Sequence, residues 1–212
     1  MSLDVGPNSR CLSLAKLILI RHGQSVWNAE NRFTGWIDVD LSEKGILEAE
    51  EAGQELRNQG INVVHTSDLI RAQRTAEIVI RANDSSNETV TKSDWRLNER
   101  NYGALQGLNK AETAEKHGSE QVRIWRRSFD VAPPDGESLE MTAERTIPYF
   151  KEKILPDLEA GMDVLVSAHG NSLRSIVMHI EEISSEDIVS FEIPTGVPRY
   201  YEFIEGEIKL VD

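Results

Sequence analysis

Cysteine is almost missing from this chain of 212 residues, since Cys11 is the only one. One thiol can form neither an internal disulfide nor a zinc site made of several thiolates. Long apolar runs are missing as well, and none approaches the ~20 residues that a membrane-spanning helix needs. These absences argue against a disulfide-rich secreted protein and against a membrane protein, and we expect a cytoplasmic location.

Positive charge is also in short supply. The chain has 23 Lys and Arg residues against 36 Asp and Glu residues, which gives a formal net charge of −13 at pH 7. Nucleic acids and anionic membranes are polyanions, so we expect neither as the main partner. A small anionic ligand is compatible with this charge if cationic residues gather in its site.

Length and composition indicate one folded domain. A chain of this size suits a single α/β domain with a substantial core, and its hydrophobic share of 39% is that of an ordinary globular protein. We expect residues 1–15, which contain Gly6, Pro7 and scattered serines, to form an N-terminal tail. Residues 16–212 are then expected to form the domain.

Two apolar runs in this sequence end in the same dipeptide. Residues 17–20 precede Arg21-His22-Gly23, and residues 164–166 lead through Ser-Ala to His169-Gly170. Continuous apolar runs of this kind are typical of strands buried on both faces of a parallel sheet. Ligands of open α/β sheets bind outside the carboxyl ends of the strands, so both histidines are predicted to face one cleft. Gly23 is expected to let the backbone approach a ligand closely.

Helical patterns alternate with strand patterns along the rest of the chain. We predict a helix capped by Ser42 and ended by Gly60, a second helix opening at Ser67, and an amphipathic helix over residues 139–154 that Pro148 should kink. A residue with a capping side chain, Asn or Ser, is predicted to start the helix after the second His-Gly. Alternating strands and helices favour an α/β fold.

The surroundings of the two histidines favour phosphate chemistry. A metal site needs at least three ligands, and neither histidine has clustered carboxylates or a second histidine at ligand spacing. A serine hydrolase of the Gly-x-Ser-x-Gly type is excluded because that motif is absent. Arginine is what lies close: Arg21 beside His22, Arg174 just beyond His169, and Arg71 after another strand. Guanidinium groups match phosphate oxygens, and nearby cations keep an imidazole neutral and nucleophilic.

Phosphoryl transfer also needs a group that protonates the leaving oxygen, and Glu99 is the candidate. It lies in a charged segment with no helical or strand period. From spacing alone, Glu99 and the pair Arg126-Arg127 fit solvent-exposed positions better than a site.

Several longer segments carry a family resemblance. Arg21-His22-Gly23 together with His169 resembles the histidine phosphatase superfamily. The segments that resemble its cofactor-dependent phosphoglycerate mutases are residues 31–36, 38–45, 97–115, 125–127 and 193–198. Taken together, the similar segments run through nearly all of residues 16–203.

The resemblance implies a three-layer α/β/α sandwich with a mostly parallel central sheet. It implies interconversion of 3-phosphoglycerate and 2-phosphoglycerate in glycolysis and gluconeogenesis, primed by 2,3-bisphosphoglycerate and without a metal. His22 matches the residue that is phosphorylated, Glu99 the acid/base, and His169 the partner that stabilises the transferring group. Arg21 and Arg71 match phosphate-binding residues. The remaining positions that match phosphate- or substrate-binding residues are Ser25, Asn28, Thr34, Gly35, Tyr102, Lys110, Arg126, Arg127, Gly170 and Asn171.

Two departures from the longer family members bear on the reaction. Only Asp135-Gly136 lies where those members carry an insertion, and the chain stops soon after Phe203. Since the tail of longer members helps to exclude water, we expect some loss of the phosphoryl group to water. The missing insertion leaves monomer and homo-oligomer both open.

Two other functions compete with the mutase. A phosphatase on the same scaffold uses His22 in the same way but transfers the phosphoryl group to water. A non-catalytic phosphate-binding scaffold is disfavoured because His22, Glu99 and His169 are all retained.

Overall fold

A six-stranded sheet forms the centre of the protein. The computed structural model describes residues 14–84 and 88–211. The strands are β1 (Ala15–Arg21), β2 (Val63–Thr66), β3 (Val90–Ser93), β4 (Val164–Ala168), β5 (Pro198–Ile204) and β6 (Glu207–Leu210). Their order is β3-β2-β4-β1-β5-β6, in which β1 to β4 run parallel, β5 pairs antiparallel with β1, and β6 pairs antiparallel with β5. The predicted mostly parallel sheet is confirmed.

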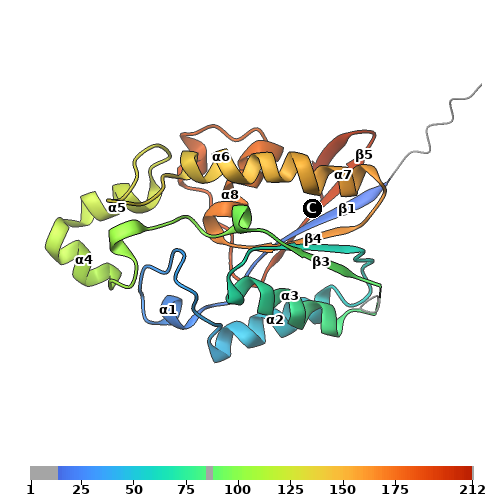
Figure 1. Cartoon of the computed structure of the whole chain (residues 1–212), viewed down its shortest axis with the longest axis horizontal. Coiled ribbons are helices and arrows are strands. Elements are labelled where there is room, and N and C mark those ends of the chain that lie inside the picture. Colours follow the sequence, from blue (N-terminus) through green and yellow to red (C-terminus); the bar gives the residue numbers. More distant parts are fainter. Residues whose placement is uncertain (1–13, 85–87, 212) are drawn as a thin grey trace, which may run out of the picture.

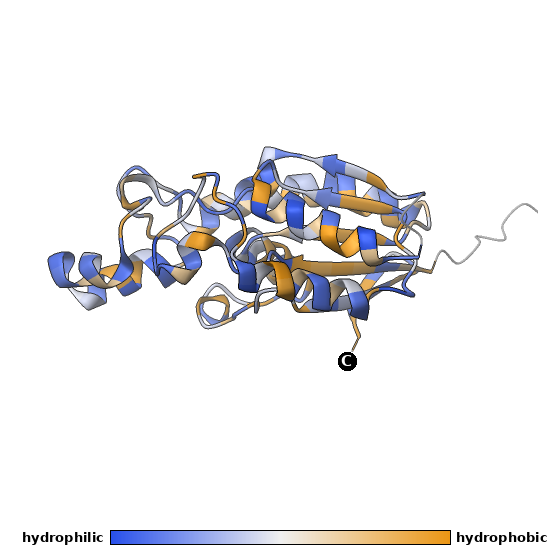
Figure 2. Cartoon of the chain, turned by 90° about the horizontal axis from the view of Figure 1, so that it is seen from below, coloured by the Kyte–Doolittle hydropathy of each residue, from blue (hydrophilic) through white to orange (hydrophobic). Residues whose placement is uncertain are grey.

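Helices cover both faces of this sheet, as Figure 1 shows. One face packs against α2 (Glu43–Glu55) and α3 (Ile70–Ala82), and the other against α6 (Leu139–Tyr149), α7 (Leu155–Glu159) and α8 (Gly170–Ile180). Two apolar cores result, one on each side of β1 and β4. Figure 2 shows the apolar strands between helices whose outer faces are hydrophilic. The three-layer α/β/α sandwich is therefore confirmed.

Three short helices lie beyond the sheet rather than on its faces. They are α1 (Val26–Ala29), α4 (Lys110–His117) and α5 (Ser119–Arg127), and α4 and α5 project away from the sheet in Figure 1. Apolar residues of α4 and α5 pack around Phe33, which is buried with Leu105 and Val122 in a small separate core. These three helices contribute to one wall of the site described below.

Several element boundaries differ from the sequence-based prediction. Ser42 caps α2 as expected, but the helix ends at Glu55 and not at Gly60. The next helix begins at Ile70 rather than Ser67, because Ser67 Oγ is engaged in side-chain contacts at the strand end. The range 139–154 is helical throughout, as predicted, but the helical backbone continues beyond it: a π-helical turn over Phe150–Ile154 follows α6 and leads into α7.

The first strand begins inside the predicted N-terminal tail. Ala15 was predicted to belong to the tail, but it is the first residue of β1 and is 1% exposed. Its side chain packs in the apolar core under α6 and α7. Residues 1–13 of the predicted tail lie outside the described residues. In the described part of the chain, no helix is both long and apolar enough to cross a membrane.

The register of the central strands brings the two histidines together. Arg21 at the end of β1 pairs with Ala168 at the end of β4, and the His22 N–H donates to the Ala168 carbonyl at 3.0 Å. His22 and His169 therefore leave adjacent strands at the same edge. The prediction that they meet at one edge of the sheet is therefore confirmed.

Gly23 is required for packing rather than for a ligand. A Cβ on Gly23 would lie 2.1 Å from the carbonyl oxygen of Gly45 in α2, and a Cβ on Gly45 would lie 2.0 Å from the Gln24 carbonyl oxygen. The two backbones approach so closely that neither position has room for a side chain. The expectation that Gly23 serves a close approach of ligand to backbone was therefore wrong, since α2 fills that space.

Candidate active site

A polar pocket of about 290 Å³ lies at the carboxyl ends of β1 and β4. Its walls come from the strand ends, the start of α8, the 28–35 and 99–102 segments, helices α4 and α5, and the 191–193 segment. Seven cationic side chains line it: Arg21, Arg32, Arg71, Lys110, Arg126, Arg127 and Arg174. A chain with an excess of acidic residues thus gathers its cations at one place, as an anionic ligand requires.

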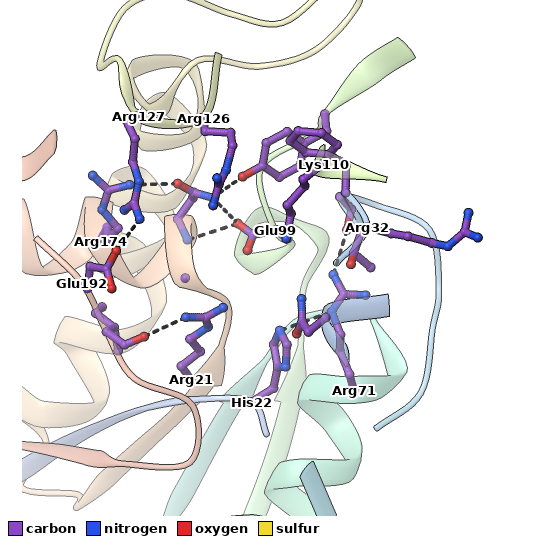
Figure 3. Close-up of a pocket in the computed structure, with 18 of the residues that line it drawn as sticks. Arg21, His22, Arg32, Arg71, Glu99, Lys110, Arg126, Arg127, Arg174 and Glu192 are labelled. Carbon is purple, nitrogen blue, oxygen red and sulfur yellow. Dashed lines mark hydrogen bonds and ion pairs between the residues drawn. The ribbon is translucent and has the colours of Figure 1, made fainter. Parts of the chain in front are cut away.

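His22 is presented as a neutral nucleophile. The ring lies 2% exposed, and its Nδ1 donates to the Gly23 carbonyl oxygen at 2.6 Å. Nε2 therefore carries the lone pair, and it accepts an N–H from Nε of Arg71 at 3.3 Å. Burial, and then the charges of Arg71 and Arg21, hold the pKa of His22 well below its ordinary value. At neutral pH the ring is uncharged, with Nε2 toward the pocket (Figure 3).

His169 lies against His22 and is also neutral. The two ring centroids are 4.9 Å apart in an edge-on arrangement. Nε2 of His169 is 2.7 Å from Ser67 Oγ, while Nδ1 is buried and has no hydrogen-bond partner among the described residues. Burial, with the charge of Arg71 second, holds the pKa of His169 well below its ordinary value. A buried ring nitrogen without a hydrogen-bond partner in the described chain is suited to a polar atom of a ligand.

Helix α8 starts differently from the prediction. His169 itself is the N-cap, and its backbone N–H donates to Ser172 Oγ at 3.1 Å. The predicted capping by a Ser side chain is therefore confirmed for Ser172, which acts from the third helical position while His169 occupies the N-cap. The helix N-terminus stays directed at the pocket through Gly170.

Glu99 lies across the pocket and is held from several sides. Its Oε1 accepts the Arg100 backbone N–H at 2.7 Å and both the backbone and side-chain N–H groups of Asn171 at 3.1 and 3.0 Å. Its carbonyl oxygen accepts from Trp36 Nε1 at 2.5 Å and from Arg145 Nη2 at 2.9 Å. With Oε1 occupied by three donors, Oε2 is the oxygen that can exchange a proton with a ligand.

Two arginines flank the nucleophile from opposite sides. Arg71 is 1% exposed, and besides His22 it donates to the carbonyl oxygens of Gly35 and Ile37 at 2.7 and 3.1 Å. Burial lowers its pKa to about 10, so it stays charged at neutral pH. Arg21 donates to the Ile193 carbonyl at 2.9 Å, and its buried Nε lacks a partner among the described residues.

The outer part of the pocket is built on Arg100 and Tyr102. Arg100 is fully buried, lies 4.7 Å from the Tyr102 ring centroid, and donates to the phenol oxygen at 3.1 Å. Burial opposes ionisation of Tyr102, but Arg100 more than offsets it and the pKa of the phenol lies below its ordinary value. Arg100 also donates to the Arg126 carbonyl at 2.8 Å, which fixes the end of α5. Lys110, whose pKa burial lowers, completes this wall.

Most residues predicted for the site line this one pocket. They are Arg21, His22, Asn28, Thr34, Gly35, Arg71, Glu99, Tyr102, Lys110, Arg126, Arg127, Gly170 and Asn171. His169 lies directly behind His22. Ser25 does not line the pocket: it caps α1, where its Oγ accepts the Asn28 N–H at 3.1 Å. The N–H of Asn171, expected to bind phosphate, is already donated to Glu99.

The sequence-based prediction missed other residues of the pocket wall. They are Arg32, Phe33, Phe191, Glu192 and Ile193, while Arg174 had been noticed only for its place in the sequence. Residues 191–193 adjoin a segment that resembles the family, which is the one signal that pointed to this wall. In the described part of the chain, no three His, Cys, Asp or Glu residues are grouped so as to hold a metal ion.

Comparisons with known proteins place the chain in a family. Residues 17–212 match the histidine phosphatase superfamily (branch 1). The 2,3-bisphosphoglycerate-dependent phosphoglycerate mutase of Protochlamydia amoebophila is 48% identical over 220 aligned positions, which cover 92% of this chain and 97% of that protein. The enzyme of the same name from Nitratidesulfovibrio vulgaris (strain Hildenborough) is 51% identical over 216 positions, 89% of this chain and 86% of that protein.

Solved structures share the fold at lower sequence identity. A structure described as mycobacterial hydrolase 1 superposes with a TM-score of 0.81 at 24% identity, covering 93% of this chain and 97% of that chain. Phosphoglycerate mutase from Bacillus anthracis superposes with a TM-score of 0.75 at 21% identity, covering 95% and 93%. The chain thus belongs to the histidine phosphatase superfamily and, within it, to the 2,3-bisphosphoglycerate-dependent phosphoglycerate mutases, which are isomerases.

Proposed function

We propose that this protein interconverts 3-phosphoglycerate and 2-phosphoglycerate, with Nε2 of His22 as the carrier of the phosphoryl group. The observation that carries the proposal is the arrangement around His22. A neutral ring, whose Nε2 lone pair accepts an N–H of Arg71 at 3.3 Å, lies beside a second histidine, with Glu99 in the same pocket. Such a set can accept a phosphoryl group and return it to a different hydroxyl.

The residues divide the transfer between them. Nε2 of His22 forms the bond to phosphorus as the bond from phosphorus to the sugar-acid oxygen breaks. Glu99 donates its proton to the departing oxygen, and in the return step it takes the proton from the hydroxyl that attacks. Arg71 and Arg21 offset the charge on the transferring oxygens, and His169 lies beside the His22 ring to stabilise the transferring group.

The pocket fits a polyanion such as 2,3-bisphosphoglycerate. Buried donors without a partner among the described residues include Arg21 Nε, Thr34 Oγ1 and Arg174 Nε, all from pocket residues. Buried donors of this kind are costly unless a ligand supplies acceptors. Bound there, 2,3-bisphosphoglycerate supplies the phosphoryl group that first loads His22. We propose that no metal takes part, since the arginines provide the positive charge that Mg²⁺ supplies elsewhere.

The proposal extends to the physiological setting. We place the reaction in glycolysis and gluconeogenesis in the cytoplasm, a location that the single cysteine supports. Its substrates are then phosphoglycerates, and nucleic acid and membrane are not partners, in line with the net charge of −13.

Hydrolysis to free phosphate is the competing outcome at the same histidine. The experiment that separates the two is incubation with 3-phosphoglycerate, with and without catalytic 2,3-bisphosphoglycerate, while 2-phosphoglycerate and free phosphate are both followed. The mutase predicts 2-phosphoglycerate that depends on the primer, with little phosphate released. Phosphate release without 2-phosphoglycerate contradicts the proposal and makes water the acceptor.

A further inference from the structure

Glu192 is an acidic residue in the wall of a pocket that gathers cations. Only two carboxylates, Glu99 and Glu192, belong to the described residues that line it. Glu99 forms no ion pair with another described residue, and its Oε1 accepts from backbone and amide N–H groups. Glu192 instead forms an ion pair with Nη2 of Arg127 (Figure 3).

This pair is unusual among the cations of the pocket. Arg32 pairs with Glu30, which lies outside the pocket wall, and Arg21, Arg71 and Arg174 donate to backbone carbonyl oxygens. Among the described residues, Arg127 is therefore the one pocket cation whose ion-pair partner also lines the pocket. A ligand carboxylate or phosphate that is to bind Arg127 must take the place of the Glu192 carboxylate.

The Glu192 side chain can leave without moving the wall. Its backbone neighbours are anchored: the Ile193 carbonyl accepts from Arg21 at 2.9 Å, and the Phe191 ring lies 5.4 Å from the Arg199 guanidinium. The Glu192 side chain itself is 68% exposed and that of Arg127 is 33% exposed. A rotation of one side chain into solvent therefore frees Arg127.

We propose that Glu192 is an internal competitor for Arg127, which weakens the binding of phosphoglycerates and other anions in this pocket. The inference rests on the proposed function only for the identity of the anion. An exposed ion pair of this kind contributes little, so its removal should change affinity by a factor of about two to five. Glu192 thus sets substrate affinity and not the chemistry at His22.

The test compares Glu192→Gln with the unchanged protein by calorimetric titration of 3-phosphoglycerate at low ionic strength. Both proteins carry His22→Ala, so that binding is measured without phosphoryl transfer. The matched control is Glu120→Gln, because Glu120 is also 68% exposed and pairs with Arg123 on the same helix, α5, outside the pocket. We expect Glu192→Gln to bind about two to five times more tightly and Glu120→Gln to bind as the unchanged protein does.

A second comparison tests whether the effect acts through Arg127. In an Arg127→Met background, Glu192→Gln should no longer tighten binding, because there is no guanidinium left to compete for. A gain that persists in that background overturns the proposal in favour of simple charge repulsion. Equal or weaker binding by Glu192→Gln in the intact pocket overturns it as well.

The role of Glu192 and the proposed function can be tested independently of each other. Inorganic phosphate is titrated in parallel, so the two proteins can be compared even if 3-phosphoglycerate is not the substrate. Failure of the unchanged protein to make 2-phosphoglycerate counts against the mutase proposal alone. If Glu192→Gln and the unchanged protein bind phosphate with the same affinity, and also bind phosphoglycerate with the same affinity, only the role of Glu192 is contradicted.

Discussion

Nε of Arg71 lies 3.3 Å from Nε2 of His22 and donates a hydrogen bond to it. The other two nitrogens of the same guanidinium are held by the carbonyl oxygens of Gly35 and Ile37, so Arg71 cannot turn away. The buried Arg71 guanidinium therefore contacts Nε2 of His22, and its positive charge disfavours protonation of that nitrogen. The same charge acts on His169, which is neutral for the same two reasons, burial and Arg71.

We expect the protein to lose stability in mild acid, because burial lowers the pKa of three of its histidines. Burial holds the pKa of His22, His65 and His169 below 6.5, their ordinary value. Below that pH the unfolded chain binds protons at these rings that the folded protein does not, so the free energy of unfolding falls as the pH falls. We expect a lower urea midpoint at about pH 5.5 than at about pH 7.5. An unchanged or higher midpoint at the lower pH contradicts these assignments.

Glu99→Gln is expected to slow the reaction by ~10²–10⁴-fold, the usual contribution of a positioned acid or base. Glutamine keeps an oxygen for the three N–H groups that Oε1 accepts, but it cannot donate or take up the proton at Oε2. The kcat for 3-phosphoglycerate measures this, with circular dichroism as a check on folding. A kcat near that of the unchanged enzyme assigns the proton transfer to another group.

Arg145→Met is expected to destabilise the protein by about 3–5 kcal/mol, the usual result of removing one partner of a buried ion pair. Arg145 binds both oxygens of Glu137, at 3.0 and 2.8 Å, and donates to three carbonyl oxygens of the 96–99 segment. The control is Arg123→Met, which breaks an exposed pair and should leave stability almost unchanged. Equal unfolding free energies for the two variants argue against this role of Arg145.

Gly23→Ala is expected to reduce activity by about 10²-fold, because the new Cβ forces the end of β1 away from α2 and moves His22. The contact is with the backbone of Gly45, which cannot move aside as a side chain can. Gly60→Ala is the comparison, since its Cβ meets only the end of the Asp163 side chain. If both variants keep full activity, the close packing of Gly23 on Gly45 does not position the nucleophile.

The sequence predicts the centre of this molecule better than its edges. Two apolar runs that end in His-Gly are enough to place His22 and His169 at one edge, because strands buried on both faces belong to a parallel sheet, whose carboxyl ends lie at the same edge. Helix ends were less predictable: nothing local shows that Ser67 is engaged by His169, which delays the start of α3 to Ile70.

The residues that hold Glu99 were not predictable from local pattern. Arg145 and Trp36 reach the Glu99 carbonyl from 46 and 63 positions away in the sequence. Glu192 reaches Arg127 across 65 positions. Such contacts depend on the conformation of the loops around the sheet, and no periodicity in the sequence indicates that conformation. Glu99 itself was singled out because a phosphoryl transfer needs an acid, and its place in the pocket agrees with that expectation.

The most direct measurement is phosphoryl transfer to the protein from labelled 2,3-bisphosphoglycerate. We expect one acid-labile phosphoryl group per chain, attached to Nε2 of His22, absent from His22→Ala, and transferred to the hydroxyl of 3-phosphoglycerate when that is added. Phosphorus NMR distinguishes attachment at Nε2 of His22 from attachment at Nδ1. We expect Nε2, because the hydrogen bond to the Gly23 carbonyl oxygen keeps Nδ1 protonated. No label, label at another residue, or label that persists in His22→Ala contradicts the account.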